Sequence, residues 1–244
     1  MHETRGPRRP ASALLRRLGT RAALAGAAGV LVAVPLTLLT VLVLSGSPRL
    51  QRLDQSVADD LHRYVVVRPA LADALGVVSV ITHPIVMRIA AAAIVVALWA
   101  RRRRRQAAWL AAATVLGSLL DPLLKEVVAR SRPSFPDPVA TAPGYSFPSG
   151  HALQSMLFAA CVLVLAHAGT AGRPLLRSLL WAGAAGLVLL TGLDRVALGV
   201  HFVSDVLAGW VVALATLCIT LAAFTVRSQE DPAAPAPPAR EDSP

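Results

Sequence analysis

Long apolar runs alternate with short charged segments along most of the chain. Runs of about 20 apolar residues are long enough to cross the roughly 30 Å hydrocarbon core of a bilayer as helices. The pattern therefore predicts an all-α, polytopic membrane protein with a bundle of six transmembrane helices. The expected spans are residues 22–44, 76–100, 106–128, 151–167, 179–193 and 200–226.

The two ends of the chain lie outside the expected membrane domain, which covers residues 22–226. Residues 1–21 are rich in arginine, and residues 227–244 have the Pro, Ala and acidic composition of a disordered tail. A cleaved signal peptide is an alternative for the start of the chain. Its apolar core would be about 7–15 residues long, however. We therefore expect residues 22–44 to form the first transmembrane helix.

Residues 45–75 show a different pattern, in which apolar residues recur at spacings of three and four among charged ones. Leu50, Leu53, Val57 and Leu61 follow this spacing, which is typical of an amphipathic helix. Two interpretations stay open. The helix lies on the membrane surface, or it is a soluble-facing connector between the first two spans.

The charge distribution indicates the orientation of the bundle. The net charge is +10, but only 16% of the residues are charged, against roughly 25% in a soluble domain. The arginines gather in residues 1–21, in Arg101–Arg105 and in the turn at residues 169–177. Cytoplasmic loops carry an excess of arginine, so we expect both termini to be cytoplasmic and the loop at residues 129–148 to be extracytoplasmic. These clusters do not form the continuous basic face of a nucleic-acid-binding protein, so no nucleic acid is expected as a partner.

One charged residue falls near the middle of the second span. Arg88 at that depth costs about 2.5–3.5 kcal/mol on an insertion scale, so its side chain is expected to face the interior of the bundle. Asp121 in the third span lies at a similar depth if the two helices are antiparallel neighbours. The sequence therefore predicts an ion pair between Arg88 and Asp121.

The predicted topology brings the remaining polar groups near the membrane to one side of the bundle. They come from the end of the third span, the start of the fourth and the start of the sixth. The residues are Lys125 and Arg132, then Ser149, Gly150 and His151, and finally Arg195, His201 and Asp205.

Singly, each of these groups also fits a structural role, such as a snorkelling cation or a helix cap. Together they suit a tetrahedral oxyanion. Guanidinium groups match phosphate oxygens, and the first N–H groups of a helix that opens at Ser149 favour an anion. His201 and Asp205 share a helix face at a spacing of four. Imidazoles can act as nucleophile, base or acid, so the set predicts catalysis on a phosphate.

Three motifs in this set resemble the signature of the type-2 phosphatidic acid phosphatase family. They are Lys125-x6-Arg132-Pro133, Pro148-Ser149-Gly150-His151 and Arg195-x5-His201-x3-Asp205, within residues 125–210. Soluble vanadium-dependent haloperoxidases share the signature, but the apolar spans favour the integral-membrane branch of lipid phosphate phosphatases.

The resemblance implies a role for each motif residue. His201 would attack phosphorus and form a phosphohistidine, Asp205 would orient its ring, and His151 would protonate the leaving oxygen. The phosphate would be bound by Lys125, Arg132, Ser149, Gly150 and Arg195. No metal and no other cofactor is implied.

One position departs from the family pattern. Asp194 stands where the family usually has serine, directly before Arg195. A carboxylate there would repel phosphate if it pointed into the pocket. It would support the pocket if it braced Arg195 or another cation from outside.

The expected function is hydrolysis of a lipid phosphomonoester or diphosphate at the outer membrane face. A composition rich in Ala, Arg, Leu and Val favours a bacterial source and hence a polyprenyl carrier such as undecaprenyl diphosphate; phosphatidic acid and phosphatidylglycerol phosphate are further candidates. Two alternatives use the same pocket. One is a lipid phosphotransferase, and the other is a non-catalytic membrane protein that binds lipid phosphates. A binding protein needs the cations but has no use for the two histidines. Nothing in the sequence indicates the oligomeric state.

Overall fold

Helices form the regular structure of the computed structural model, which describes residues 29–30 and 32–226. The expected all-α fold is confirmed for these residues. The basic segment at residues 1–21 and the tail at residues 227–244 lie outside them. The elements are a helix at Val32–Leu44, α2 at Pro48–Val66, α3 at Pro69–Ile81, α4 at Pro84–Ala100, α5 at Arg104–Val128, α6 at Gly150–Ala166, a 3-10 turn at Ala168–Thr170, α7 at Pro174–Ala197 and α8 at Val203–Val226.

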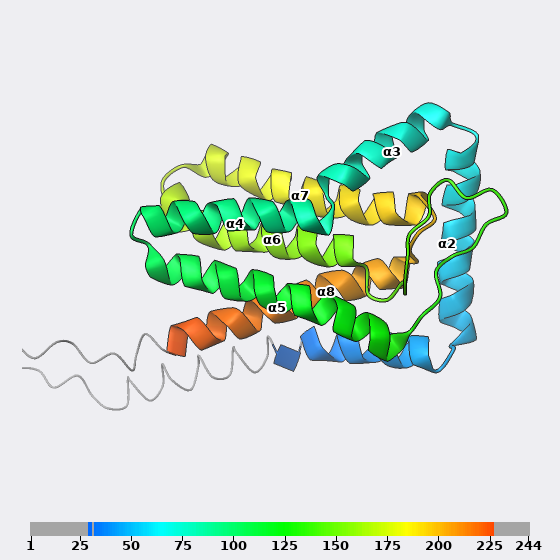
Figure 1. Cartoon of the computed structure of the whole chain (residues 1–244), viewed down its shortest axis with the longest axis horizontal. Helices are drawn as coiled ribbons and strands as arrows, with labels where there is room; N and C mark the ends of the chain where they lie inside the picture. The colour runs from blue at the N-terminus through cyan, green and yellow to red at the C-terminus, as the bar shows by residue number, and fades with distance from the viewer. Residues whose placement is uncertain (1–28, 31, 227–244) are drawn as a thin grey trace, which may run out of the picture.

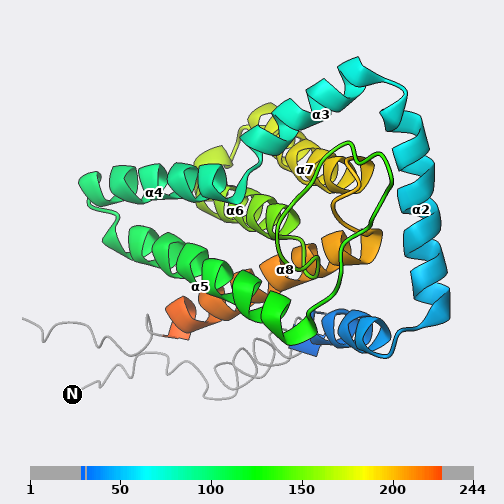
Figure 2. The same cartoon turned by 45° about the vertical axis from the view of Figure 1, so that its right-hand side comes forward.

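Helix α6 is the centre of the bundle, and α4, α5, α7 and α8 all pack against it (Figures 1 and 2). The main core cluster joins α5, α6 and α8 and includes Leu110, Leu157 and Val212. Gly117 on α5 permits the close approach to α6, because a Cβ atom there would lie 2.6 Å from Leu157 Cδ2. The core therefore lies between the helices, where no lipid reaches.

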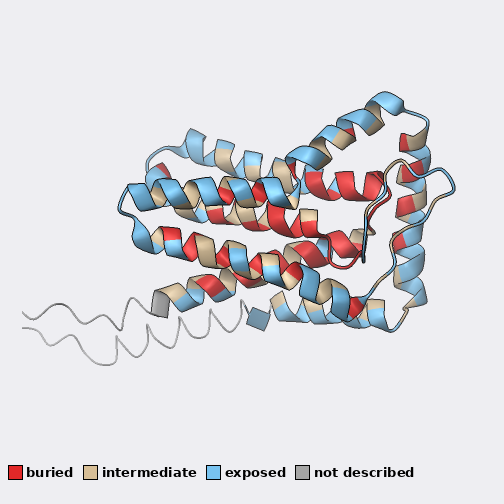
Figure 3. Ribbon diagram, viewed as in Figure 1, coloured by how far each residue is buried: buried red, intermediate tan, exposed pale blue. Residues whose placement is uncertain are grey.

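The outward faces of the bundle are exposed (Figure 3), and many of the residues on them are large and apolar. Val96 is 68% exposed and Leu119 is 63% exposed, and many other large apolar side chains are exposed as well. A soluble protein rarely exposes so much contiguous apolar surface, whereas lipid covers it in a membrane. Within the described residues, four helical stretches are long and apolar enough to span a bilayer. The chain is therefore a membrane protein with several transmembrane helices.

The expected count of six spans stays a prediction. The four qualifying stretches in the described part of the chain are Pro69–Ala100, which joins α3 and α4, and then Arg104–Val128, Pro174–Ala197 and Val203–Phe224. The helix at Val32–Leu44 qualifies only together with α2, and the two are bent by 91°. Helix α6 is apolar but has only 17 residues, fewer than the roughly 20 that cross a bilayer upright.

The amphipathic helix expected within residues 45–75 is α2, and it crosses one end of the bundle (Figure 1, right). Its buried residues are Asp54, Ala58, His62 and Val65, which recur at helical spacing on one face. That face is turned towards α7, α3 and α8. Helix α2 is therefore a cover for this end of the bundle, a role that neither interpretation from the sequence included.

The expected second span is broken near its start. Helix α3 ends at Ile81 and α4 begins at Pro84, because a proline has no N–H to continue the helical hydrogen bonds. His83 caps the new helix, and its Nδ1 accepts a hydrogen bond from the Ile85 N–H at 3.2 Å. The other predicted spans match α5, α6, α7 and α8, with α7 beginning at Pro174 instead of residue 179.

The predicted ion pair between Arg88 and Asp121 is wrong. Asp121 Oδ1 lies 3.0 Å from Lys125 Nζ, one turn further along α5. Arg88 is half-buried on α4, and its Nε is buried without a hydrogen-bond partner among the described residues. A neighbour at a spacing of four on the same helix is always within reach of a carboxylate, whereas similar depth on two helices does not bring two side chains face to face.

Candidate active site

The three motifs meet at the end of the bundle that α2 covers (Figure 2). The Ser149 N–H at the start of α6 donates to the Asp205 carbonyl oxygen in the first turn of α8, at 2.9 Å. Gly209 permits this closeness, because a Cβ atom there would lie 2.7 Å from the Ser149 carbonyl oxygen. The second and third motifs are thus joined directly through their backbones.

His201 lies in the tight turn between α7 and α8, and only 3% of it is exposed. Arg132 Nη1 lies 3.1 Å from its Nε2. A guanidinium group has donors only, so Nε2 presents its lone pair to Arg132 and the ring proton is on Nδ1. Nδ1 in turn lies 3.5 Å from Asp205 Oδ2, without a hydrogen bond of normal geometry. The imidazole is therefore a neutral ring held between a cation and a carboxylate.

Burial lowers the pKa of His201 below its usual 6.5, and the nearby Asp205 carboxylate opposes this shift without overcoming it. Desolvation disfavours the charged form of an imidazole. The charges of Arg132 and Lys125 act in the same direction as burial. Nε2 of His201 therefore stays unprotonated at neutral pH, as a nucleophile requires.

Arg132 is fixed by the loop that carries it. Its Nε donates to the Gly144 carbonyl oxygen at 3.0 Å, and its Nη2 donates to the carbonyl oxygens of Pro143 and Tyr145, each at 3.0 Å. Its Nη1 also donates to the Val200 carbonyl oxygen at 2.7 Å. The loop at residues 129–148 thus wraps its own cation and holds it against the turn of His201.

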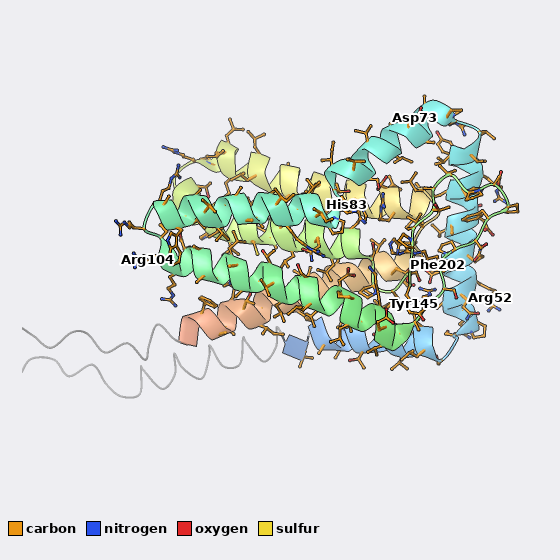
Figure 4. The ribbon with its side chains drawn as sticks, in the orientation of Figure 1. Arg52, Asp73, His83, Arg104, Tyr145 and Phe202 are labelled. Carbon is orange, nitrogen blue, oxygen red and sulfur yellow. The ribbon has the colours of Figure 1, made fainter. Side chains whose placement is uncertain are left out.

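His151 lies in the first turn of α6, two residues after the N-cap residue Ser149. Its Nε2 faces Arg195 Nη1 at 3.5 Å. The ring of His83 lies edge-on to it, with the ring centroids 5.3 Å apart; Figure 4 labels His83 where α3 gives way to α4. Both motif histidines therefore direct Nε2 at a motif arginine, His201 at Arg132 and His151 at Arg195.

Asp194 braces Arg195 from within the protein. The aspartate is fully buried, and its Oδ2 accepts from Arg195 Nε at 2.8 Å and also from Nη2. A charge-assisted pair of this kind fixes the plane of the guanidinium group. The carboxylate that stands in place of the usual serine thus supports the cation and leaves Nη1 directed at His151.

Lys125 and Gly150 are linked through Asp121. The lysine forms its ion pair with Asp121, and a Cβ atom at Gly150 would lie 2.7 Å from Asp121 Oδ2. Glycine therefore lets the carboxylate of α5 approach the start of α6. The structure brings all the site residues expected from the sequence to this one end of the bundle.

A family model, described as the PAP2 superfamily, matches residues 106–229, just over half of the chain and all three motifs. The chain belongs to the PAP2 superfamily. The resemblance to type-2 phosphatidic acid phosphatases is thereby confirmed.

Two curated relatives in the same superfamily are phosphatases. Phosphatidylglycerophosphatase B of Bacillus subtilis (strain 168) is 40% identical over 100 residues, which cover 39% of this chain and 47% of the relative. Decaprenylphosphoryl-5-phosphoribose phosphatase of Mycolicibacterium smegmatis (strain ATCC 700084 / mc(2)155) is 39% identical over 107 residues, which cover 42% of this chain and 52% of the relative. The chain thus matches about half the length of each relative.

A solved PAP2 structure shares the fold. It is the crystal structure of the first transmembrane PAP2 type phosphatidylglycerolphosphate phosphatase from Bacillus subtilis. The TM-score is 0.63 at 22% sequence identity, and the alignment covers 82% of this chain and 98% of the solved one. The likeness therefore extends over helices outside the PAP2 family match.

Arg130, Asp54 and Ser204 form a network that the sequence analysis missed. Arg130 Nη1 donates to Asp205 Oδ1 and to Ser204 Oγ, both at 2.6 Å, and Nη2 donates to Asp54 Oδ2 at 2.8 Å. Asp54 also accepts from the Ser204 N–H at 3.0 Å. One signal was available: an acid at position 54 lies on the apolar face that Leu50 and Leu61 define. Helix α2, outside the PAP2 family match, thus reaches the motif aspartate through one arginine.

A second contact joins α2 to the loop and to the turn of His201. His62 on α2 is buried, its Nε2 lies 3.0 Å from Asp137 Oδ1, and its ring stacks on Phe135 at 3.9 Å. This hydrogen bond lowers the pKa of Asp137. Gly199, at a φ of 70°, leaves room for Phe135, because a Cβ atom would lie 2.9 Å from its ring. The cover helix, the loop and the turn therefore pack as one unit around the PAP2 motifs.

Proposed function

We propose that this protein is a membrane lipid phosphatase that removes a terminal phosphate from a lipid through a phosphohistidine on His201. The observation that carries the proposal is the contact between Arg132 Nη1 and His201 Nε2 at 3.1 Å. It places the lone pair of an unprotonated imidazole at a cation suited to phosphate. A site that only bound an anion would have no need of this arrangement.

Phosphate binding uses the donors that now face the histidines. Arg132 and Arg195 transfer their Nη1 donors from the imidazoles to phosphate oxygens, and Lys125 adds a third positive charge. The backbone N–H groups at the start of α6, after Ser149, add donors at the positive end of a helix. Phosphorus then lies between His201 Nε2 and His151 Nε2.

In the first step, His201 Nε2 attacks phosphorus as the bond from phosphorus to the lipid oxygen breaks. His151, protonated while the phosphate dianion offsets the charge of Arg195, gives its proton to the leaving oxygen. The arginines stabilise the negative charge on the equatorial oxygens of the transition state. His201 becomes a phosphoimidazolium whose Nδ1–H faces the Asp205 carboxylate.

In the second step, water attacks the phosphorus of the phosphohistidine. His151, now neutral, takes a proton from that water, and the bond from phosphorus to Nε2 breaks. Inorganic phosphate leaves, and His201 returns to the neutral form with its proton on Nδ1. Protons and charges balance over the two steps, and neither step needs a metal ion.

Arg130 and Asp54 are positioning residues in this scheme. Arg130 holds Asp205 Oδ1, and Asp54 holds the other side of the guanidinium group. Asp205 Oδ2 then keeps its place between the Phe202 N–H, at 2.9 Å, and His201 Nδ1. The orientation of the nucleophile thus depends on a residue of the cover helix.

The relatives suggest the substrate class. One is named for phosphatidylglycerophosphate, and the other for decaprenylphosphoryl-5-phosphoribose. In both names, a terminal phosphate sits on a polyol or sugar that a second phosphate joins to the lipid. We propose a lipid phosphomonoester of this kind as the substrate here, with undecaprenyl diphosphate and phosphatidic acid as further candidates.

The site is proposed to face the outside of the cell. The Arg101–Arg105 block lies at the end of the bundle opposite Tyr145 and Phe202, as the label of Arg104 in Figure 4 makes plain. An arginine cluster of this kind favours the cytoplasmic side. Six spans follow only if both α6 and the helix at Val32–Leu44 cross the bilayer in addition to the four long helical stretches.

The test is a substrate panel on the purified protein in detergent, with a chelator present. We expect phosphate release from at least one lipid phosphate, and its loss in His201→Ala. In His151→Ala, an acid-labile phosphoenzyme should accumulate with a substrate whose leaving group needs no protonation. An equal rate in His201→Ala would contradict the proposal. Transfer of phosphate to an added acceptor lipid, in place of release to water, would identify a phosphotransferase.

A further inference from the structure

A cavity of about 520 Å³ adjoins the phosphate-binding end of the site. Arg132 forms part of its wall, and so do Gln51, Arg52 and Gln55 of α2. Small-molecule sites commonly measure about 300–1,000 Å³. The cavity therefore has room for more than the single phosphate that Arg132 would bind, and the mechanism leaves the rest of it unused.

The wall changes in character from one side to the other. Leu42 and Val43, at the end of the first described helix, form an apolar part of the wall. Helix α2 leaves this corner at 91° and adds its polar residues beyond it. Figure 4 labels Arg52 on α2, at the same end of the bundle as Phe202 in the same cavity wall. The wall of the cavity thus combines apolar residues with a polar group of side chains from α2 and with Arg132, which would bind the reacting phosphate.

Arg52 is the cation of this polar group that is left for a ligand. Of the arginines in the wall, Arg130 is bound to Asp54 and Asp205, and Arg132 is held by its loop at the turn of His201. Among the described residues, Arg52 takes part in no ion pair. Its guanidinium group matches the oxygens of a phosphodiester.

The neighbouring amides add hydrogen-bonding groups of the right kind for hydroxyls. Gln55 Nε2 donates to Asp59 Oδ1 at 2.8 Å, so its Oε1 is the atom that can accept from a hydroxyl group. Gln51 lies one turn before Gln55 on the same side of α2, because residues four apart share a helix face. Together with Arg52, these side chains make a surface for a polyol that carries an anion.

We propose that this cavity is a second anion site, in which Arg52 binds the phosphodiester that links the head group to the lipid and the glutamines bind the polyol between the two phosphates. The inference rests on the proposed function and narrows its substrate class. The preferred substrate has two phosphates, with the terminal one at Arg132 and the linking one at Arg52. Phosphatidic acid has a single phosphate and leaves the Arg52 site unused.

The experiment compares two substrates with the same acyl chains, phosphatidylglycerophosphate and phosphatidic acid, in the same detergent micelles. Arg52→Ala should raise KM about tenfold for the first, because it removes a charge-assisted contact, and less than twofold for the second. Arg52→Lys should recover part of the loss. Arg49→Ala is the matched control, because Arg49 lies on α2 outside the cavity wall, and it should change neither KM.

Binding of phosphatidylglycerol separates this inference from the proposed function. That lipid carries the linking phosphodiester but no phosphate to remove, so its dissociation constant does not depend on catalysis. It should rise about tenfold in Arg52→Ala and stay unchanged in Arg49→Ala. If the parent hydrolyses neither substrate but Arg52→Ala weakens this binding, the second anion site stands and the proposed function fails. If Arg52→Ala leaves this dissociation constant unchanged, or raises KM by the same factor for both substrates, the proposal of a second anion site is wrong.

Discussion

The contact between Arg132 and His201 is compatible with only one tautomer of the neutral imidazole. The distance from Arg132 Nη1 to His201 Nε2 is 3.1 Å, and an arginine cannot accept a hydrogen bond. The proton of the ring is therefore on Nδ1, on the side of Asp205, and the lone pair is on the side of the cations. The same contact links the first PAP2 motif to the third.

The protonation state of His201 leads to the first expectation. Burial lowers its pKa below 6.5, so the part of the kcat/KM profile that His201 controls should be level through neutral pH and fall on the acid side, where Nε2 gains a proton. In Asp205→Asn, the carboxylate that raises this pKa is gone. The acid limb should then move to lower pH while kcat falls. A pH profile of kcat/KM for both proteins measures the two effects, and an acid limb that moved to higher pH in Asp205→Asn would contradict the assignment.

The same shift predicts a loss of stability in acid. The unfolded chain protonates His201 near pH 6.5, whereas the folded protein does so only at lower pH. Between these two pKa values the unfolded state binds more protons, so the contribution of His201 is fully present above pH 6.5 and is lost as the pH falls through this window. The unfolding temperature of the parent and of His201→Gln, measured in detergent from pH 7.5 down to pH 4.5, should differ in slope there.

Removal of Arg130 should move the acid limb of the kcat/KM profile in the direction opposite to that expected for Asp205→Asn. Without this cation, the charge of Asp205 is offset less and raises the pKa of His201 further. Arg130→Met should therefore move the acid limb to higher pH. Loss of a partner that orients a metal-bound histidine typically costs about 10–100-fold; by analogy, kcat should fall by about that factor here, with KM nearly unchanged. Asp54→Asn should lower kcat by a smaller factor, because the amide still accepts from Ser204.

Asp60→Asn is the matched control for Asp54→Asn. Asp60 lies on the same helix and pairs with Arg63 at the exposed surface, where an ion pair contributes about 0–1 kcal/mol. Its kcat, KM and pH profile should equal those of the parent. If Arg130→Met and Asp54→Asn lowered the unfolding temperature but left the pH profile in place, their role would be structural only.

The site illustrates what a linear sequence can and cannot supply. Lys125, Ser149, His151 and His201 could be found because helix ends and short spacings express their positions locally. The pairing of Arg130 with Asp54 spans 76 residues, and no periodicity encodes a contact at that separation. The predicted ion pair between Arg88 and Asp121 was wrong for the same reason. Equal depth in two helices does not determine the direction in which a side chain points.

The position of α2 is the largest feature of the fold that the hydrophobic pattern of the sequence does not determine. An apolar stripe on α2 predicted an amphipathic helix, and both a membrane surface and a protein surface satisfy such a stripe. Asp54 within the stripe distinguishes them, because a buried carboxylate needs a buried cation, and a lipid surface offers none. The cation that pairs with Asp54 is Arg130, which lies in the loop after α5 and far from Asp54 in the sequence.

Asp194 should be essential to the shape of the pocket, although the family usually has serine there. Asp194→Ser leaves Arg195, which is 4% exposed, without its carboxylate. Removing one partner of a buried ion pair costs about 3–5 kcal/mol, so the unfolding temperature should drop. KM should rise more than kcat falls, because Arg195 is freed to move but remains in the pocket.

The serine variant separates bracing from repulsion. If the Asp194 carboxylate repelled phosphate, Asp194→Ser would lower KM and leave the rest of the protein unaffected. Asp194→Asn provides a second measurement, since it keeps the shape and one acceptor oxygen. It should fall between the parent and Asp194→Ser in both stability and KM.

Gly209 should be required for the alignment of α6 with α8. A Cβ atom at this position would lie 2.7 Å from the Ser149 carbonyl oxygen, and a backbone atom in a helix cap cannot move aside alone. Gly209→Ala should therefore push the helices apart and stretch the hydrogen bond from the Ser149 N–H to the Asp205 carbonyl oxygen. Overpacking of this kind costs about 1–3 kcal/mol, and the shift of His151 relative to His201 should lower kcat at least tenfold.

Gly183→Ala on α7 is the matched control, because nothing lies within 4 Å of a Cβ atom there. Alanine in a helix interior is more stable than glycine by about 0.5–1 kcal/mol, so this variant should melt slightly higher than the parent with unchanged kcat. The two substitutions are chemically identical and both fall within membrane helices. If Gly209→Ala kept its activity, the backbone contact between Ser149 and Asp205 would not determine the distance between the two histidines.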